Sequence, residues 1–355
     1  MRGFIKQLKS SYKKKYNLSR IKQDIDETVK LLEKDWDILK NSNILISGGT
    51  GFFGRAIIPS MIHANNLKNL NLCIYLISRD ENPQSHFEMI KDHYGILRFI
   101  KSDIRNFSSK DLNINYIIHA ATNSDSEFIK NNPELTLDTI VIGTKKLLEF
   151  SLTQKKLKSF LFISSGAVNS ANKIHNRPIS ETDIYSLDDN DKLFSYSFGK
   201  KTAEKYLMEY HKKHNIPIKI LRGFSFIGPQ INLNQKLALT YLVNCLIKNK
   251  DIIVFNPECK RSFMYTSDLV NWIIKVMLYA NSGTIYNLGS DEEISIKDLA
   301  KKILKYNDKI KLTEKESTSN NYYVPDLEII KKELGLEITV SLDESISRLM
   351  TFYKE

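Results

Sequence analysis

Short apolar runs alternate with amphipathic segments along the chain from residue 43 onward. Most of these runs are apolar at nearly every position, which is typical of parallel strands that are covered on both faces. The pattern predicts strands at 43–47, 72–78, 97–101, 116–119, 160–164, 218–222 and 284–288, with helices at 55–64, 135–151 and 199–211 among the intervening segments. This order predicts an α/β fold with a doubly wound parallel sheet and right-handed crossovers.

The regular alternation loosens from about residue 223, which predicts a second, smaller lobe. We expect one domain over 43–222, to which 264–290 return, and the smaller lobe over 223–263 and 291–355. Residues 1–42 form a separate extension, in which apolar residues between 19 and 40 recur three and four apart, as on one face of a helix. We expect this face to pack on the adjacent domain or on a second subunit, with a peripheral, basic anchor at a membrane surface as the alternative.

The formal net charge of the 355 residues is +11, and its distribution matters more than its sum. Residues 1–22 hold eight basic residues and no acidic one, so the rest of the chain is close to balanced. We therefore expect no nucleic-acid partner. Binding of nucleic acid by the basic N-terminus is the alternative, and it would be strongly salt-dependent.

The three cysteines, Cys73, Cys245 and Cys259, lie far apart and lack metal-ligand spacing, which argues against a zinc site and against a disulfide framework. The N-terminus lacks the apolar core of a secretory signal. No segment offers the roughly 18 uncharged apolar residues of a membrane span. These features predict a cytoplasmic protein without a bound metal.

The first predicted strand leads into "GGTGFFGR", in which Gly48, Gly51 and Gly54 are spaced three apart. Without side chains, such residues let backbone N–H groups approach a pyrophosphate at the positive end of the following helix. In this strand–turn–helix context the loop predicts a dinucleotide site. The domain over 43–222 is therefore expected to be a dinucleotide-binding Rossmann domain.

The end of the second predicted strand, "YLISRD", indicates which dinucleotide is preferred. An NAD site usually has a carboxylate where Ser78 stands, to hold the ribose hydroxyls, whereas the neighbouring Arg79 suits a 2′-phosphate. NADP is therefore favoured, and NAD stays open because Asp80 is one position further along. Asp103 follows the third strand and is placed to accept from an adenine amino group, although a plain surface acid would look the same there.

A candidate acid–base group lies in "SYSFGKKTAEKYL", where Tyr196 and Lys200 are four residues apart near the start of a predicted helix. This spacing puts the phenol and the ammonium on one helix face, about 6 Å apart. The nearby cation lowers the tyrosine pKa from about 10, which makes the phenol a usable acid or base. Ser165 follows a buried strand, at the end where ligands of doubly wound sheets bind, and can hydrogen-bond the same substrate oxygen.

Together these residues resemble the extended short-chain dehydrogenase/reductase superfamily, specifically its NAD(P)-dependent sugar-nucleotide epimerase/dehydratase family. The similarity extends from about residue 42 to the C-terminus. Besides the Tyr196/Lys200 pair, it is carried by "GGTGFFG", "IIHAAT" at 117–122, "GTKKLLEF" at 143–150, "FISSGAV" at 162–168, "RGFSFIGP" at 222–229, "RSFMYTSDL" at 261–269 and "YNLGS" at 286–290.

The resemblance implies roles for particular residues. Ser165, Tyr196 and Lys200 match the family's catalytic triad, with Lys200 also holding the nicotinamide ribose. The residues implied at the cofactor are Gly48, Thr50, Gly51, Phe52, Phe53, Gly54, Ser78, Arg79, Asp103, Ile104, Ala120, Ala121, Thr122, Tyr196, Lys200 and Phe224. Those implied at the sugar nucleotide are Asn123, Ser165, Gly166, Ser225 and Arg261, of which Arg261 matches a diphosphate-binding arginine. A homodimer is also expected from the family.

One departure from the family bears on the reaction. Members that eliminate water carry Asp and then Glu after the catalytic Ser or Thr, and decarboxylases usually keep a Glu there; this chain has Gly166 and Ala167, which cannot move a proton. The sequence therefore favours a 4-epimerase or 4-ketoreductase of a nucleotide-activated sugar, in surface-polysaccharide precursor synthesis. A 4,6-dehydratase or decarboxylase is the alternative, and a non-catalytic NADP-binding regulator is the alternative from another class.

Overall fold

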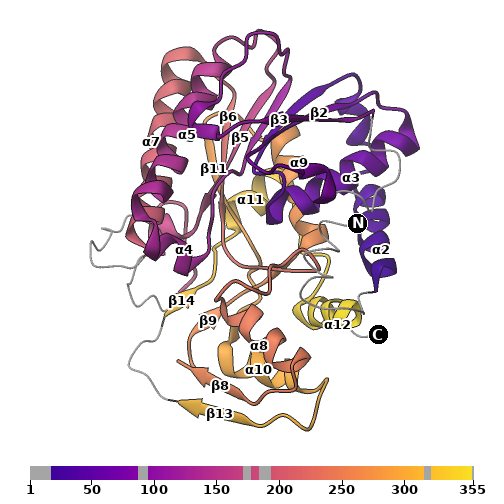
Figure 1. Cartoon of the computed structure of the whole chain (residues 1–355), viewed down its shortest axis with the longest axis vertical. Coiled ribbons are helices and arrows are strands. Elements are labelled where there is room, and N and C mark those ends of the chain that lie inside the picture. The colour runs from indigo at the N-terminus through magenta and orange to yellow at the C-terminus, as the bar shows by residue number, and fades with distance from the viewer. Residues whose placement is uncertain (1–16, 87–94, 171–176, 184–192, 316–320, 354–355) are drawn as a thin grey trace.

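A computed structural model describes residues 17–86, 95–170, 177–183, 193–315 and 321–353 (Figure 1). Most of the basic N-terminal stretch, residues 1–16, lies outside the described residues. Within the described ranges, no helix combines the length and the hydrophobicity needed to cross a lipid bilayer.

The centre of the fold is a seven-stranded sheet in the order β11-β6-β5-β4-β1-β2-β3, with every neighbouring pair parallel. Its strands are β1 (Asn43–Ser47), β2 (Cys73–Ser78), β3 (Leu97–Lys101), β4 (Tyr116–His119), β5 (Ser159–Ser165), β6 (Ile218–Gly223) and β11 (Thr284–Leu288). All seven predicted strands are confirmed, with ends that differ by one residue at most. From β1 the strands β2 and β3 continue to one edge of the sheet, and β4, β5, β6 and β11 continue to the other. This is the doubly wound fold that the alternation predicts.

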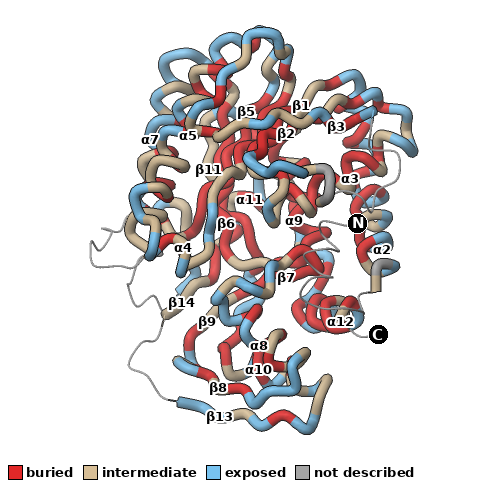
Figure 2. The backbone as a smooth tube through the Cα atoms, in the orientation of Figure 1, coloured by how far each residue is buried: buried red, intermediate tan, exposed pale blue. Residues whose placement is uncertain are grey.

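Helices cover both faces of the sheet (Figure 1). They are α3 (Phe52–Lys68), α4 (Ser126–Asn131), α5 (Pro133–Ser151), α6 (Ala167–Ser170), α7 (Phe194–His214), α9 (Thr266–Tyr279) and α11 (Glu328–Leu334), with 3-10 turns η2 (Pro83–His86) and η3 (Ile104–Asn106). Adjacent residues of β1 point to opposite faces, because Leu45 packs with α5 and α7 while Ile44 and Ile46 pack with α3 and α9. Burial on both faces explains why the strands are apolar throughout (Figure 2).

The long helices α3, α5 and α7 begin earlier than the apolar periodicity predicts. Glycine or proline marks two of these starts: Gly51 is the N-cap of α3, and Pro133 occupies the first turn of α5. Such residues favour a helix start through their backbone conformation and leave no apolar pattern to read.

A smaller lobe lies below the carboxyl ends of the strands in Figure 1. Its elements are β7 (Phe226–Ile227), α8 (Ala238–Ile247), β8 (Ile252–Phe255), β9 (Lys260–Arg261), β10 (Met264–Tyr265), β12 (Ile294–Ser295), α10 (Ile296–Leu304), β13 (Leu312–Lys315), β14 (Tyr322–Tyr323) and α12 (Leu342–Tyr353). A separate apolar core, drawn largely from α8, α10 and α12, holds it together. Leu327, Ile330 and Leu336, around α11, instead join the core of the sheet.

The N-terminal extension packs on the larger domain. Its predicted single helix is two pieces, α2 (Leu18–Leu31) and the 3-10 turn η1 (Trp36–Leu39). The break occurs where the Trp36 indole donates a 3.1 Å hydrogen bond to the Val29 carbonyl, which the helix no longer uses. Leu32, Trp36 and Leu39 are nevertheless fully buried against the sheet's helices, so the apolar stripe has the function of a packing face.

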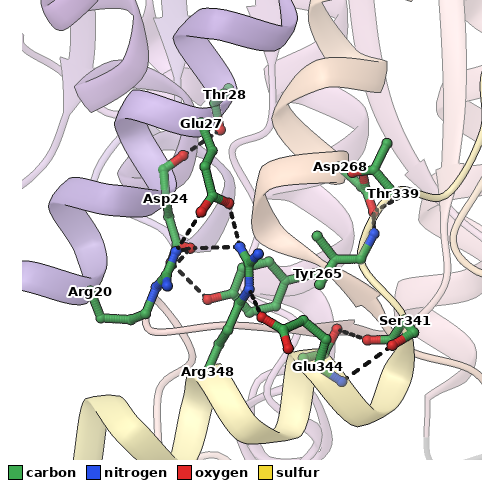
Figure 3. A network of polar contacts seen from close by, with 12 residues as sticks. Arg20, Asp24, Glu27, Thr28, Tyr265, Asp268, Thr339, Ser341, Glu344 and Arg348 are labelled. Carbon is green, nitrogen blue, oxygen red and sulfur yellow. Dashed lines mark hydrogen bonds and ion pairs between the residues drawn. The ribbon is translucent and has the colours of Figure 1, made fainter.

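A polar network joins α2 to the smaller lobe (Figure 3). Asp24 on α2 is buried, accepts a 2.7 Å hydrogen bond from the Tyr265 hydroxyl and pairs with Arg20 at 2.6 Å. Arg348 of α12 bridges Asp24 and Glu27. Burial raises the pKa of Asp24, and the hydrogen bond from Tyr265 and the charge of Arg20 oppose that rise. The first and last described helices are thereby tied to the strand that follows Arg261.

Two adjacent leucines test whether the extension is part of the folded core. Leu32→Ala removes a fully buried side chain and should lower the free energy of unfolding by about 2–5 kcal/mol. Leu31→Ala changes a side chain that is 46% exposed and should cost no more than about 0.5 kcal/mol. Urea denaturation of both variants measures the difference, and equal values would mean that the extension does not dock as described.

Candidate active site

The glycine loop runs from the carboxyl end of β1 into α3 with almost no room for side chains. Gly48 has φ +74°, a left-handed conformation, and a Cβ there would lie 2.6 Å from the Ala120 carbonyl oxygen. A Cβ on Gly54 would lie 2.1 Å from the Gly49 carbonyl oxygen. The bare backbone and the uncapped start of α3 together leave N–H groups facing outward, which is the arrangement that binds a pyrophosphate.

A cavity of about 920 Å³ lies at the carboxyl ends of the strands, between the sheet and the smaller lobe. All but two of the residues predicted at the cofactor and the sugar nucleotide line it. The exceptions are Gly54, which packs against Gly49, and Gly166, whose Cβ position is filled by the ring of Phe224 at 2.7 Å. Residues that lie far apart in the sequence thus meet at one place.

Ser165, Tyr196 and Lys200 all line this cavity. Ser165 is the last residue of β5, and the other two lie on the first turns of α7. The Lys200 Nζ is 5.9 Å from the centre of the Tyr196 ring and donates a 2.7 Å hydrogen bond to the Ile163 carbonyl of β5. The helix therefore presents both side chains to the strand end that carries the serine.

Burial changes the acid–base properties of this group. It lowers the pKa of Lys200 to about 7, against the charge of Glu204. It also raises the pKa of Tyr196, so the lowering expected from the nearby Lys200 cation is wrong: burial outweighs it, and hydrogen bonding to Ser165 only opposes the rise. A phenol and an ammonium that share a low-dielectric site are the kind of pair that exchanges protons with a bound substrate.

A buried ion pair between Glu204 and Arg222 lies next to the site, and the sequence analysis did not single it out. Glu204, one turn after Lys200, accepts hydrogen bonds from Ser164 at 2.5 Å and from Arg222 at 2.8 and 3.0 Å. These contacts join α7 to the ends of β5 and β6. In the sequence, the spacing of four between Lys200 and Glu204 indicates that Glu204 lies on the same helix face as Lys200.

At the far end of the cavity, the groups around Ser78 lack a free carboxylate. The Asp80 carboxylate is engaged by the His86 ring at 2.7 Å. Asp103 is bonded by the Arg105 guanidinium, which lowers the pKa of its carboxyl group. Arg79 lies 3.8 Å from Asp103, with 60% of its side chain exposed. Ser78 and Arg79 both line the cavity, as predicted for this end.

The opposite end is lined by Phe224, Ser225, Arg261 and a residue that the sequence analysis missed, Tyr323. The Tyr323 ring lies between the Phe224 ring, with centroids 4.7 Å apart, and the Arg261 guanidinium, 5.6 Å away. No signal near Tyr323 in the sequence indicates this position, because it depends on how β14 returns to β9. Among the described residues, Asp103 is the sole carboxylate in the wall of the cavity.

Comparisons with known proteins agree with this architecture. The profile of the NAD dependent epimerase/dehydratase family matches residues 44–289. UDP-glucuronic acid decarboxylase 3 of Arabidopsis thaliana is 29% identical over 312 residues, which are 86% of this chain and 87% of the relative.

Two solved structures share the fold at low sequence identity. A UDP-glucose 4-epimerase from Thermotoga maritima, solved with UDP-glucose, has a TM-score of 0.72 and 20% identity, over 87% of this chain and 98% of that chain. A dTDP-glucose 4,6-dehydratase from Streptomyces venezuelae, solved with NAD, has a TM-score of 0.73 and 19% identity, over 88% and 96%. The relatives include a decarboxylase, an epimerase and a dehydratase, so they do not single out one of these reactions.

Proposed function

The chain belongs to the NAD dependent epimerase/dehydratase family, and we propose that it is a 4-epimerase or a 4-ketoreductase of a nucleotide-activated sugar. The observation that carries this proposal is the convergence of Ser165, Tyr196 and Lys200 at a cavity end whose described wall holds no carboxylate. Such a site can move a proton at one oxygen and lacks a second acid–base pair for elimination.

The glycine loop fits a nicotinamide dinucleotide. Gly48 leaves open the space that a Cβ would close against Ala120, and Gly51 begins α3 without a side chain. The loop and the helix start would hold the pyrophosphate, and Lys200 would hold the nicotinamide ribose. When bound, this cofactor supplies or accepts the hydride at C4 of the sugar.

The protein's own residues handle the proton. For reduction, the Tyr196 phenol gives its proton to the C4 oxygen, and Lys200 stabilises the phenolate that remains. For oxidation, the phenolate takes the proton from the C4 hydroxyl. Ser165 hydrogen-bonds the same oxygen in both directions, and Arg261 would pair with the diphosphate of the substrate. An epimerase needs both directions in turn, and a reductase needs only the first.

The sequence has no acidic residue at the two positions after Ser165, and the packing leaves no room for an acidic side chain at the first of them. An Asp at Gly166 would meet the Phe224 ring, which itself packs against the Tyr323 ring with centroids 4.7 Å apart. Ala167 carries no acid. Proton abstraction from the sugar carbon next to C4, which elimination of water requires, therefore has no group among the described residues to perform it.

Decarboxylation is a second candidate, and the similarity to UDP-glucuronic acid decarboxylase 3 favours it. Oxidation of C4 in a uronic acid sugar creates a β-keto acid, which loses CO2 without removal of a carbon-bound proton. The same Tyr196 chemistry would serve this reaction. The lack of a Glu after Ser165 counts against this candidate, and the substrate that is converted distinguishes the two.

Incubation with a panel of nucleotide sugars, their uronic acids and their 4-keto derivatives, with and without NADPH, tests the proposal. We expect either isomerisation without net consumption of cofactor or oxidation of NADPH by a 4-keto sugar. Release of CO2 from a uronic acid would establish the second candidate. A 4-keto-6-deoxy product from a hexose would refute the argument from Gly166 and Ala167.

Replacement of the phenol tests the acid–base group directly. Tyr196→Phe should lower kcat by at least about a hundredfold, because proton transfer is lost, while the cofactor remains bound. Tyr206→Phe on the same helix, at a side chain 38% exposed, is the matched control and should keep full activity. Steady-state kinetics and cofactor titration measure both effects, and an active Tyr196→Phe would remove the proposed acid.

We further propose that the cofactor is NADP, because Arg79 faces the cavity beside Ser78 while Asp80 is engaged by His86. Arg79→Ala should weaken NADPH binding about ten- to a hundredfold, as expected for a charge-assisted contact, and leave NADH binding unchanged. Arg98→Ala, at an exposed position on β3, is the control. Fluorescence titration decides the question: equal losses for both nucleotides would exclude a 2′-phosphate contact.

A further inference from the structure

Near the carboxyl end of β2, the wall of the cavity includes a histidine that neither the glycine loop nor the proposed proton transfer uses. His86 is the last residue of the 3-10 turn η2, and it lines the cavity together with Ser78 and Arg79. Its side chain is 11% exposed. The ring therefore forms part of the surface that a bound dinucleotide would meet at this end.

The carboxylate of Asp80 lies on the other side of this ring. Asp80 does not line the main cavity. It lines a separate surface pocket of about 250 Å³, whose other residues are Glu81, Asn82, Pro83, Phe99 and Lys101. The His86 Nε2 is 2.7 Å from the Asp80 Oδ2. The imidazole ring thus separates the carboxylate from the cavity.

Both oxygens of the Asp80 carboxylate are engaged. Oδ1 accepts a 3.0 Å hydrogen bond from the Asn82 N–H, and Oδ2 makes the contact with His86. The Asn82 N–H and then the His86 ring lower the pKa of Asp80, so the carboxylate is ionised at neutral pH. An ionised carboxylate can only accept, so the His86 Nε2 carries the hydrogen and donates it.

Two neighbouring carboxylates are held by permanent cations. Asp103 is bonded by the Arg105 guanidinium at 2.9 Å. Glu81 pairs with the Lys101 ammonium at 2.6 Å. Asp80 is instead held by an imidazole, so the restraint on this carboxylate depends on one histidine ring.

A carboxylate turned toward the cavity at this point would change which nucleotide is favoured. The Asp80 N–H donates to the Ser78 Oγ at 3.1 Å, which keeps the residue at the edge of the cavity. From there, its negative charge would repel the 2′-phosphate that Arg79 suits. Its oxygens would accept from the ribose hydroxyls, as the carboxylate of an NAD site does.

We propose that His86 is a specificity-determining residue for the dinucleotide, which acts through Asp80. By holding that carboxylate away from the cavity, the ring favours a ribose that carries a 2′-phosphate over one with free hydroxyls. This inference rests on the proposed use of NADP and adds to it the group that restrains the competing carboxylate. The role of His86 is positioning, and the contact with the phosphate belongs to Arg79.

His86→Ala tests the inference through the ratio of the Kd of NADH to the Kd of NADPH, measured by fluorescence titration of the full chain without sugar. Release of Asp80 should lower this ratio about five- to tenfold, because its charge then opposes the 2′-phosphate. Local disorder of the turn would weaken both nucleotides alike. An unchanged ratio would therefore overturn the proposal.

The chain offers a matched control for the loss of an imidazole. His63, on α3, forms a second histidine–aspartate pair, with its Nε2 3.0 Å from the Asp26 Oδ1, and it does not line the cavity. His63→Ala should leave the ratio unchanged. A drop equal to that of His86→Ala would mean that the effect is not specific to Asp80, contrary to the proposal.

Two further variants separate positioning from a direct effect of the ring. His86→Gln keeps a side-chain N–H that can donate to Asp80, so it should hold the ratio within about twofold of the wild type. In the Asp80→Asn background, His86→Ala should have no further effect on the ratio. A drop of the same size in that background would show that the ring acts independently of Asp80, and the inference would fail.

The same titrations keep this inference apart from the proposed function. A wild-type ratio below one would refute the preference for NADP, while the change of the ratio in His86→Ala would still decide the role of His86. Conversion of a nucleotide sugar does not enter the measurement.

Discussion

The hydrogen bond from the Lys200 ammonium to the Ile163 carbonyl, at 2.7 Å, is the contact on which the candidate site depends. It joins α7 to β5 and thereby places Tyr196 beside Ser165. A cation so deeply buried loses hydration, which is why its pKa falls to about 7. The Phe162 ring at 4.7 Å and the charge of Glu204 offset part of this loss. The Lys200 amine is therefore a buried group with a strongly lowered pKa, which is typical of a functional site.

The rest of the molecule sets the distance between this charge and Arg261 at the other side of the cavity. Arg261 and Tyr323 lie opposite each other in a small sheet of the lower lobe, and Ile179 and Asn287 fasten that sheet to the main one. On the other side, Tyr265 is bonded to Asp24 of the N-terminal helix. The extension is thus part of the scaffold that keeps the two lobes in register around the cavity.

Packing restricts the chemistry available beside Ser165. The ring of Phe224 occupies the volume above Gly166, and Tyr323 supports that ring from behind. A neutral phenol with a raised pKa can donate a hydrogen bond at neutral pH but is a poor base. Two phenols and one serine suit hydride transfer at a single carbon–oxygen bond, and the nearest described carboxylate of the wall, Asp103, is already engaged by Arg105.

The sequence by itself determined the strands of the sheet, because most of them are buried on both faces and are therefore apolar at nearly every position. It also indicated the glycine loop and the Tyr196/Lys200 pair, since those depend on spacing within one turn or one helix. It could not place Tyr323, because that residue lines the cavity only after β14 has returned beside β9. Nor could it tell that Phe224 fills the space over Gly166, or that Trp36 interrupts the N-terminal helix. Those features depend on contacts between residues far apart in the chain, and only the tertiary structure decides such contacts.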